Sequence, residues 1–294
     1  MATRRDEDRT FAEYRKEGDQ WITFADGEFY PDVLKSARAL YEPVVVGFGE
    51  LLAHAKSSED LLRKIDAERN PIRTQLHRVF HRYVCPAAPV ESLKVRQNLE
   101  ENIRIYGERF RPVEEVRELF QTRPIGDETL CALFYEYSQR GKKGYDLTEE
   151  FFDAFELRFP DLHIDGPVRA GKDVCLGTVF QDYPNPRRPA DFVIRDSGAR
   201  GVLAVGFARY DSDRGGAQED DRISGNKNAA DEILTYARNA GLSVKVIFLN
   251  DGPGLLLGSM WRDYSNLEHS WSGKIRVMTL RMVPNRLTHE WLLS

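Results

Sequence analysis

The chain has 294 residues, of which 41% are hydrophobic and 30% charged, a composition typical of a globular protein with a large buried core. No apolar run approaches the length of a membrane span, and the N-terminal residues lack a signal-peptide core, so we expect a cytoplasmic protein without membrane contact. The formal net charge of −5 argues against a protein that coats nucleic acid through overall positive charge, but does not exclude a sequence-specific DNA-binding protein.

The first half of the chain has a mostly helical apolar pattern. Ser58 precedes one periodic apolar set, and helix ends are expected at Asn70-Pro71 and Cys85-Pro86. The predicted helices are Asp32 to Leu40, Val44 to His54, Ser58 to Glu68, Ile72 to Tyr83, Val90 to Tyr106, Val113 to Phe120, Asp127 to Ser138 and Leu147 to Phe159.

From about Ile164 the apolar pattern changes to the period of strands. One further helix is expected, from Asn228 to Ala240. The sequence therefore predicts an α/β protein, with a mainly helical region over residues 1–145 and an α/β core over 146–294. The predicted strands are Val174 to Phe180, Asp191 to Arg195, Val202 to Arg209 and Val244 to Asn250.

The most informative segment is strand, turn, strand, charged loop, helix, strand, with Asp191 directly after Pro189-Ala190. This order resembles the catalytic core of the PD-(D/E)xK nucleases and, within them, the type II restriction endonucleases. The resemblance covers the C-terminal part of the chain and implies a mixed sheet flanked by helices. In the family the second strand carries an acid and, two residues on, usually a lysine. The aligned positions here are Gly206 and Ala208.

The resemblance implies a Mg²⁺ site, because Mg²⁺ prefers carboxylate oxygens and activates water for phosphodiester hydrolysis. Asp191 and an acid expected at position 206 would hold the ion, and the backbone carbonyl of Phe207 would also contact it. Lys227 or Lys245 could replace the lysine missing at Ala208. A glutamate of the preceding helix sometimes assists, and the candidates here are Glu149, Glu150 and Glu156.

Gly206 has three explanations. A glycine inside a strand often marks a bulge or a close approach of backbone. Alternatively, the chain is an inactivated nuclease in which a glutamate at position 206 was replaced, or another acid takes its place. Asp191 also has a second explanation, because aspartates frequently cap turns after proline-rich loops.

The segment from Arg209 to Asn228 is unusually polar. It is either a solvated excursion whose charges pair with one another or a DNA-binding loop in which arginines contact guanine and neighbouring acids orient them. Arg214, beside Gly215-Gly216, is the arginine expected to reach a base. The candidate DNA-binding residues are Arg209, Asp211, Asp213, Arg214, Gln218, Arg222, Asn226 and Lys227.

Two further basic features are weaker. Arginines and histidines recur at helical spacing between Ile72 and Tyr83, which is typical of a solvated face and alternatively of a helix that follows phosphates. The turn Arg140-Gly141-Lys142-Lys143-Gly144 has the same two explanations. The three cysteines and six histidines show no metal-ligand spacing, and no nucleotide-binding or serine-hydrolase motif occurs.

We therefore expect a sequence-specific endonuclease that cuts double-stranded DNA with Mg²⁺. The helical region would supply DNA contacts or dimerisation, and the resemblance implies a homodimer on a near-palindromic site. One alternative is a DNA-repair nuclease of the same fold. The other is a noncatalytic DNA-binding protein that kept the fold and lost the acid.

Overall fold

The computed structural model describes residues 9–25, 27–123, 127–139, 142–169, 171–196, 201–212 and 218–294, without the side chains of 218–222. These residues form two compact units. One combines the described residues up to 25 with those from 142 onward, and the other spans 27–139. Each unit has its own hydrophobic core. The described helices include none long and apolar enough to cross a bilayer.

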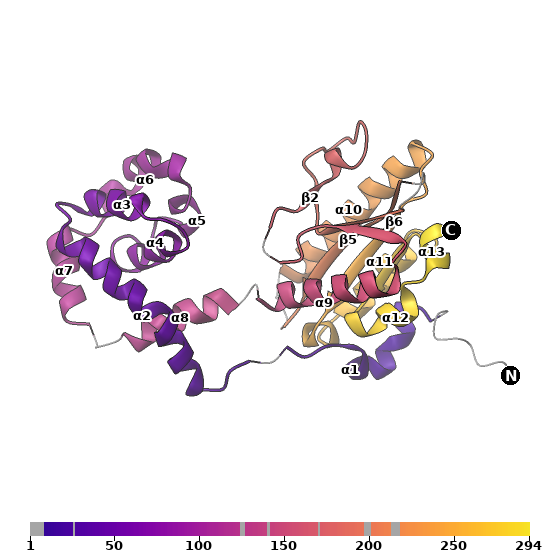
Figure 1. The fold of residues 1–294 in the computed structure, drawn as a ribbon, viewed down its shortest axis with the longest axis horizontal. Helices are drawn as coiled ribbons and strands as arrows, with labels where there is room; N and C mark the ends of the chain where they lie inside the picture. Colours follow the sequence, from indigo (N-terminus) through magenta and orange to yellow (C-terminus); the bar gives the residue numbers. More distant parts are fainter. Residues whose placement is uncertain are drawn as a thin grey trace. The chain divides into compact units, whose positions relative to one another are not determined.

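The unit of residues 27–139 is helical (Figure 1). Its helices bury aromatic and aliphatic side chains at helical spacing, and Ser57 caps α3 by accepting a hydrogen bond from the Asp60 N–H at 3.1 Å. The elements are α2 (Asp32–Ala53), α3 (Ser58–Ala67), α4 (Ile72–Tyr83), α5 (Val90–Leu93), η3 (Arg96–Asn98), α6 (Leu99–Tyr106), η4 (Gly107–Arg109), α7 (Val113–Gln121) and α8 (Glu128–Gln139).

Helix α2 continues through Pro43, where the sequence predicted two helices. Proline interrupts the helical hydrogen bonding, but Pro43 is exposed, and Tyr41 and Val44 on either side of it are buried in one core. Packing on both sides of the proline therefore holds the helix together. Conversely, the single helix predicted from Val90 to Tyr106 divides into α5, η3 and α6.

In the α/β unit the described strands form a five-stranded mixed sheet in the order β1-β4-β5-β6-β7 and a small two-stranded sheet of β2 and β3. β1, β4 and β5 pair antiparallel, whereas β5, β6 and β7 run parallel. The strands are β1 (Leu162–Asp165), β2 (Val174–Cys175), β3 (Pro189–Ala190), β4 (Phe192–Asp196), β5 (Val202–Tyr210), β6 (Lys245–Asp251) and β7 (Ile275–Met278).

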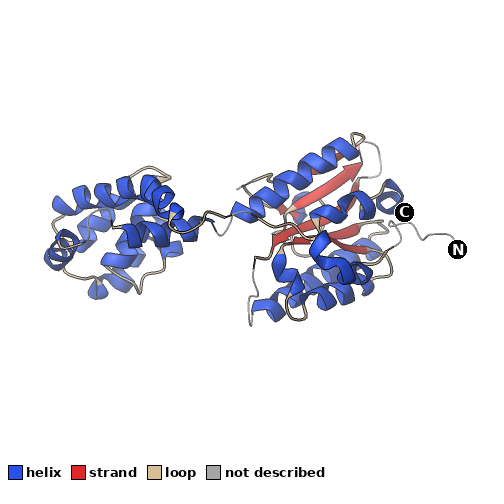
Figure 2. Cartoon of the chain, turned by 90° about the horizontal axis from the view of Figure 1, so that it is seen from below, coloured by secondary structure: helices blue, strands red, loops and turns tan. Residues whose placement is uncertain are grey.

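Helices cover both faces of the large sheet (Figure 2). α9 packs on one face, where Phe151 lies 4.9 Å from the ring of Phe192. The remaining elements of the unit are η2 (Phe11–Glu17), α1 (Gly18–Trp21), α9 (Lys142–Arg158), η5 (Leu176–Thr178), α10 (Gln218–Asn239), η6 (Pro253–Leu256), α11 (Met260–His269), η7 (Leu280–Met282), α12 (Val283–Arg286) and α13 (His289–Leu293).

The N-terminal segment belongs to the α/β unit, which corrects the predicted helical region of residues 1–145. Phe11 and Tyr14 are fully buried in the α/β core, and α1 lies beside the C-terminal elements in Figure 1. These contacts join segments far apart in the sequence, so no local pattern encodes them. The described residues of the helical unit end at 139, and those of the α/β unit resume at 142 instead of 146.

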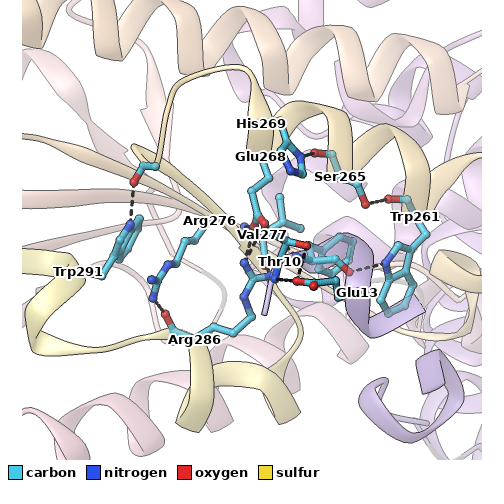
Figure 3. A network of polar contacts seen from close by, with 12 residues as sticks. Thr10, Glu13, Trp261, Ser265, Glu268, His269, Arg276, Val277, Arg286 and Trp291 are labelled. Atoms are coloured by element: carbon cyan, nitrogen blue, oxygen red, sulfur yellow. Dashed lines mark hydrogen bonds and ion pairs between the residues drawn. The ribbon is translucent and has the colours of Figure 1, made fainter. Parts of the chain in front are cut away.

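A buried ion pair fastens this segment. Glu268 accepts hydrogen bonds from Arg286 through both oxygens at 2.8 Å, and its Oε1 also accepts from the Phe11 N–H at 2.9 Å. Figure 3 shows Glu268 and Arg286 at the centre of the network, with Trp261, whose indole N–H donates to the Phe11 carbonyl at 2.8 Å. Breaking such a buried pair costs about 3–5 kcal/mol, so the network is a main support of the unit.

Candidate active site

Asp191 lies at the bend between β3 and β4, where the sequence places it at the start of a strand. Its N–H donates to the Gly206 carbonyl at 3.0 Å, and its Oδ2 accepts from the Ala208 N–H at 2.8 Å. Asp191 is therefore tied to the neighbouring strand β5 at two points, once through its backbone and once through its carboxylate. Among the described residues no hydrogen bond reaches its Oδ1, which leaves that oxygen able to take a further ligand.

A second carboxylate, Asp173, lies beside Asp191. Val174 pairs with Ala190 in the small antiparallel sheet, and continuing that register by one residue places Asp173 opposite Asp191. Burial raises the pKa of Asp191, the Ala208 N–H opposes this rise, and the nearby Asp173 carboxylate raises the pKa further. Sequence reasoning missed Asp173, because an exposed aspartate in a loop carries no signal until the strand pairing is known.

The excursion between β2 and β3 is anchored on α10. The Arg188 guanidinium forms an ion pair with Glu232, with Nε at 3.3 Å from Oε1, and the Tyr236 hydroxyl donates to the Gln181 carbonyl at 2.5 Å. The rings of Phe180 and Tyr236 lie 5.3 Å apart beside these contacts. This anchoring fixes the position of β2 and therefore that of Asp173 beside Asp191.

As the strands are packed, Gly206 has no room for a side chain. It pairs with Phe192, and a Cβ atom built on it would lie 2.0 Å from the Phe192 ring, which is packed against α9. A glutamate at position 206 would therefore require the Phe192 ring to move, and the expected inactivated variant stays a prediction. The structure shows neither a bulge nor a close approach of backbone at Gly206, because the group next to it is the side-chain ring of Phe192 and the strand pairing there is regular.

The strand pairing also shows that the residues of β5 on the face of Asp191 are not the two that the sequence predicted, but their neighbours one position along the strand. Because side chains alternate along a strand, Ala208 shares the α9 face with Gly206, whereas Phe207 and Arg209 share the opposite face. Phe192 points to α9, so Asp191 lies on the same face as Phe207 and Arg209. Phe207, whose carbonyl was expected to contact the metal, stacks on Phe248 at 5.5 Å.

Arg209 and Asp211 form a pair at the end of β5. The Arg209 Nε lies 2.8 Å from the Asp211 Oδ1, with side chains 42% and 2% exposed. Asp211 was predicted to contact DNA directly. Its burial excludes it from the surface and leaves it the role of holding Arg209.

The rest of the predicted polar loop is partly helical, because α10 begins at Gln218 instead of near Asn228. The extension is anchored by Ile223, which packs against the core, and by Asn226, whose Nδ2 donates to the Tyr264 hydroxyl at 3.2 Å. Asn226 therefore contributes to packing between helices, while Lys227 is exposed. The residues predicted to contact DNA whose side chains lie outside the described part are Asp213, Arg214, Gln218 and Arg222.

The proposed replacement lysine Lys245 is at the wrong end of the sheet. It pairs with Ala204, four residues before Ala208, and its Nζ donates to the Ser294 hydroxyl at 2.8 Å. Burial, together with the charges of Lys274 and Arg276, lowers the pKa of Lys245 to about 8. Its perturbed pKa therefore reflects local packing far from Asp191.

The first two basic side chains of α4, Arg73 and His77, are buried. They belong neither to a solvated face nor to a surface that could follow DNA phosphates. Arg73 is 6% exposed and donates to Asp66 at 2.6 Å, and His77 is fully buried. Burial lowers the pKa of His77 to about 4, with the Arg73 charge as the next cause. At neutral pH His77 is therefore an uncharged core residue.

The candidate glutamates of α9 lie away from the sheet. Phe151 and Phe155 face the core, whereas Glu150 and Glu156 are exposed and Glu149 forms an ion pair with Arg169. Of the basic turn, Arg140 and Gly141 lie outside the described residues, and the Lys143 ammonium lies 5.9 Å from the centre of the Tyr210 ring.

The site offers a divalent cation two carboxylates, those of Asp191 and Asp173. No three His, Cys, Asp or Glu side chains group around one point within the described ranges. Mg²⁺ nevertheless commonly binds one or two carboxylates and completes its shell with water and phosphate oxygens. Asp191 and Asp173 offer two adjacent carboxylates, and a cation between them would relieve the repulsion that raises the pKa of Asp191.

No protein-family model, curated protein or solved structure matches the chain.

Proposed function

We propose that this chain is a Mg²⁺-dependent endonuclease of double-stranded DNA, of the PD-(D/E)xK type and the type II restriction class. The proposal is supported by the order of the elements. A helix, α9, precedes the antiparallel strands β1, β4 and β5, and α10 then leads to the parallel strand β6. This is the order that the sequence resemblance implies.

The observation that carries the proposal is the position of Asp191. It lies at the bend directly before β4, tied to β5 through the Gly206 carbonyl and the Ala208 N–H, with Asp173 beside it. Titratable groups perturbed by burial and by a like charge are frequent in active sites. The partly buried Asp191 carboxylate has one oxygen without a hydrogen bond from the described residues and lies next to a second carboxylate, so it is suited to bind a hard cation.

Each residue of the site would have its own role in phosphodiester hydrolysis. Asp191 and Asp173 would hold Mg²⁺, which when bound supplies an activated water and positive charge at the phosphate. The Ala208 N–H fixes the orientation of the Asp191 carboxylate. In the hydrolysis the water oxygen joins phosphorus, the bond to the leaving oxygen breaks, and that oxygen takes a proton. A homodimer would cut both strands of a near-palindromic site.

One observation favours a second function, a noncatalytic DNA-binding protein on a degenerate nuclease fold. On the face of Asp191, strand β5 offers Phe207 and no acid among its described residues. The two functions differ in whether Asp173 replaces that acid. A repair nuclease of the same fold is distinguished by its products.

The test is incubation of phage and plasmid DNA with the wild-type chain and Mg²⁺ or Mn²⁺, alongside Asp191→Asn and the matched control Asp165→Asn. Asp165 is a half-exposed aspartate on β1 that pairs with Arg195. Discrete fragments from the wild type and from Asp165→Asn, but none from Asp191→Asn, are expected.

The other outcomes each identify a different protein. A smear or structure-dependent cuts would indicate a repair nuclease, and DNA binding without cutting would indicate the noncatalytic protein. Cutting by Asp191→Asn at the wild-type rate would place the active site elsewhere.

A further inference from the structure

A half-exposed guanidinium lies at the carboxyl end of β5, on the face of Asp191. Arg209 follows Ala208, whose N–H binds Asp191, and alternation along the strand places its side chain on the face away from α9. Its Nε donates to Asp211 at 2.8 Å. Within the described part of the chain no other group binds Arg209, so its two terminal amino groups remain available to a ligand.

The carboxylate that holds Arg209 is fixed in place by backbone. The Asp211 N–H donates to the Asp251 carbonyl at 2.8 Å, and its own carbonyl accepts from the Gly254 N–H at 2.8 Å. Gly252 lies between these contacts with φ of +101°, and a Cβ on it would lie 2.4 Å from the Asp211 carbonyl oxygen. Only glycine allows the turn to approach Asp211 so closely.

Further hydrogen bonds hold the end of β6, directly before this turn. The buried Asp251 carboxylate accepts hydrogen bonds from the N–H groups of Thr23 at 2.7 Å and Leu280 at 2.9 Å, which join three distant segments. The Tyr210 hydroxyl donates to the Thr23 carbonyl at 3.0 Å on the same segment. Arg209 therefore projects from a rigid platform.

The ion pair between Arg209 and Asp211 adds little to the stability of the fold. A half-exposed ion pair contributes about 0–1 kcal/mol, and ordering an arginine side chain costs up to roughly 2 kcal/mol of rotamer entropy. What the pair achieves is orientation, since a guanidinium held at Nε presents its two terminal amino groups in a fixed direction. That fork matches two oxygens of a phosphate.

We propose that Arg209 binds the phosphodiester that is cut, with Asp211 as its positioning residue. The inference rests on the proposed function and assigns one more group to the same site. Asp191 and Asp173 repel a DNA phosphate, and Arg209 supplies positive charge on the same face and edge of the sheet. The ligand is a phosphate oxygen of DNA rather than a base.

The experiment compares Arg209→Ala, Arg209→Lys and Asp211→Asn with the matched control Arg195→Ala. Arg195 also donates through Nε to an aspartate, Asp165, at 2.6 Å, but lies toward the other end of β4. Single-turnover cleavage of a plasmid that the wild type cuts is measured first. Binding of a mixed-sequence DNA duplex in Ca²⁺ is then measured at several salt concentrations.

Removing one preorganised donor to a reacting oxyanion lowers rates by about 10²–10³-fold, so Arg209→Ala should lose about 100-fold in cleavage. Its binding should lose about one unit of salt slope. Arg209→Lys keeps the charge without the fork and should recover part of both losses. Asp211→Asn should keep the full salt slope and slow cleavage by about 10-fold, because the charge remains but its orientation loosens.

The inference fails if the wild type cuts DNA and Arg209→Ala cuts as fast, or if Arg195→Ala loses as much as Arg209→Ala. If the wild type cuts no DNA, the proposed function fails separately, and the salt slope still decides whether Arg209 contacts a phosphate. An unchanged slope in Arg209→Ala would then overturn the inference as well. Thermal melts of all four variants check that each is folded.

Discussion

Asp191 and Asp251 both lie beside β5, Asp191 partly buried and Asp251 fully buried, and the environments of their carboxylates differ. Asp251 ends β6, and its carboxylate accepts three backbone N–H groups, from Thr23 at 2.7 Å, Gly252 at 2.6 Å and Leu280 at 2.9 Å. From the described residues the Asp191 carboxylate accepts one, from Ala208 at 2.8 Å, and it has a second carboxylate beside it.

The perturbed pKa does not separate these two residues. Burial raises the pKa of Asp251, and the N–H groups of Thr23, Leu280 and Gly252 oppose the rise. Burial also raises the pKa of Asp191. Hydrogen-bond saturation does separate them, because a carboxylate already bound by three donors joins chain segments, whereas one with a free oxygen can take a ligand. The predictions below test this distinction.

The largest effect is expected for Asp251→Ala. The substitution leaves three backbone N–H groups without their acceptor in a fully buried place, and each unsatisfied group costs about 1–3 kcal/mol. We expect a loss of about 4 kcal/mol in the free energy of unfolding, measured by urea denaturation with Asp165→Ala as control. A loss below about 1 kcal/mol would mean that the saturated carboxylate is not structural.

The next largest loss of stability is expected from a substitution at Gly206 on β5, the strand next to both aspartates. Gly206→Ala forces a Cβ against the Phe192 ring, and overpacking of this kind costs about 1–3 kcal/mol. We expect about 3 kcal/mol in the same denaturation experiment, and partial recovery when Phe192→Leu is added. Normal stability together with new cleavage activity in Gly206→Glu would restore position 206 as the place of a catalytic acid.

Local patterns predicted most of the elements. The helices α3 and α4 begin and end within a residue of their predicted bounds, because each buries a clear apolar stripe. The short strands β1 and β7 and the attachment of Phe11 to the α/β unit were missed. Short strands carry little periodic signal, and contacts between distant segments carry none.

For the site, the sequence placed Asp191 next to β5 but assigned the wrong face to its partners. A strand has a period of two, so an error of one residue moves every side chain to the other face. Gly206 and Ala208 were chosen, whereas Phe207 and Arg209 share the face of Asp191. Asp173 depended on the pairing of β2 with β3, a two-residue ladder that no composition rule detects.

A smaller effect is expected when the neighbour of Asp191 loses its charge. Asp173→Asn removes one of two carboxylates, and we expect about a tenfold weaker binding of Mn²⁺ to the DNA complex by calorimetry. The same change removes a repulsion that raises the pKa of Asp191, so the acid limb of the cleavage–pH profile should move to lower pH. An unchanged profile and metal affinity would remove Asp173 from the site.

The smallest effect tests the difference between Asp191 and Asp251 most directly. Asp191→Asn should stabilise the fold, whereas Asp251→Ala should destabilise it. The asparagine keeps an oxygen for the Ala208 N–H and removes a partly buried charge whose pKa burial raises. Sites kept for function rather than stability commonly gain about 0.5–1 kcal/mol on such a change. Urea denaturation at pH 7 without metal measures it.

The sign of the pH dependence follows from the direction of the pKa. The folded pKa of Asp191 lies above its unfolded value of 3.8, so the wild-type contribution is fully present below 3.8 and is lost as pH rises through the folded pKa. The advantage of Asp191→Asn should therefore appear only above that range and vanish in acid. Adding Mg²⁺ should stabilise the wild type but not the variant, since a ligand of the folded state shifts unfolding by mass action. A variant less stable than the wild type at pH 7, or equally stabilised by Mg²⁺, would place Asp191 with Asp251 among the structural carboxylates.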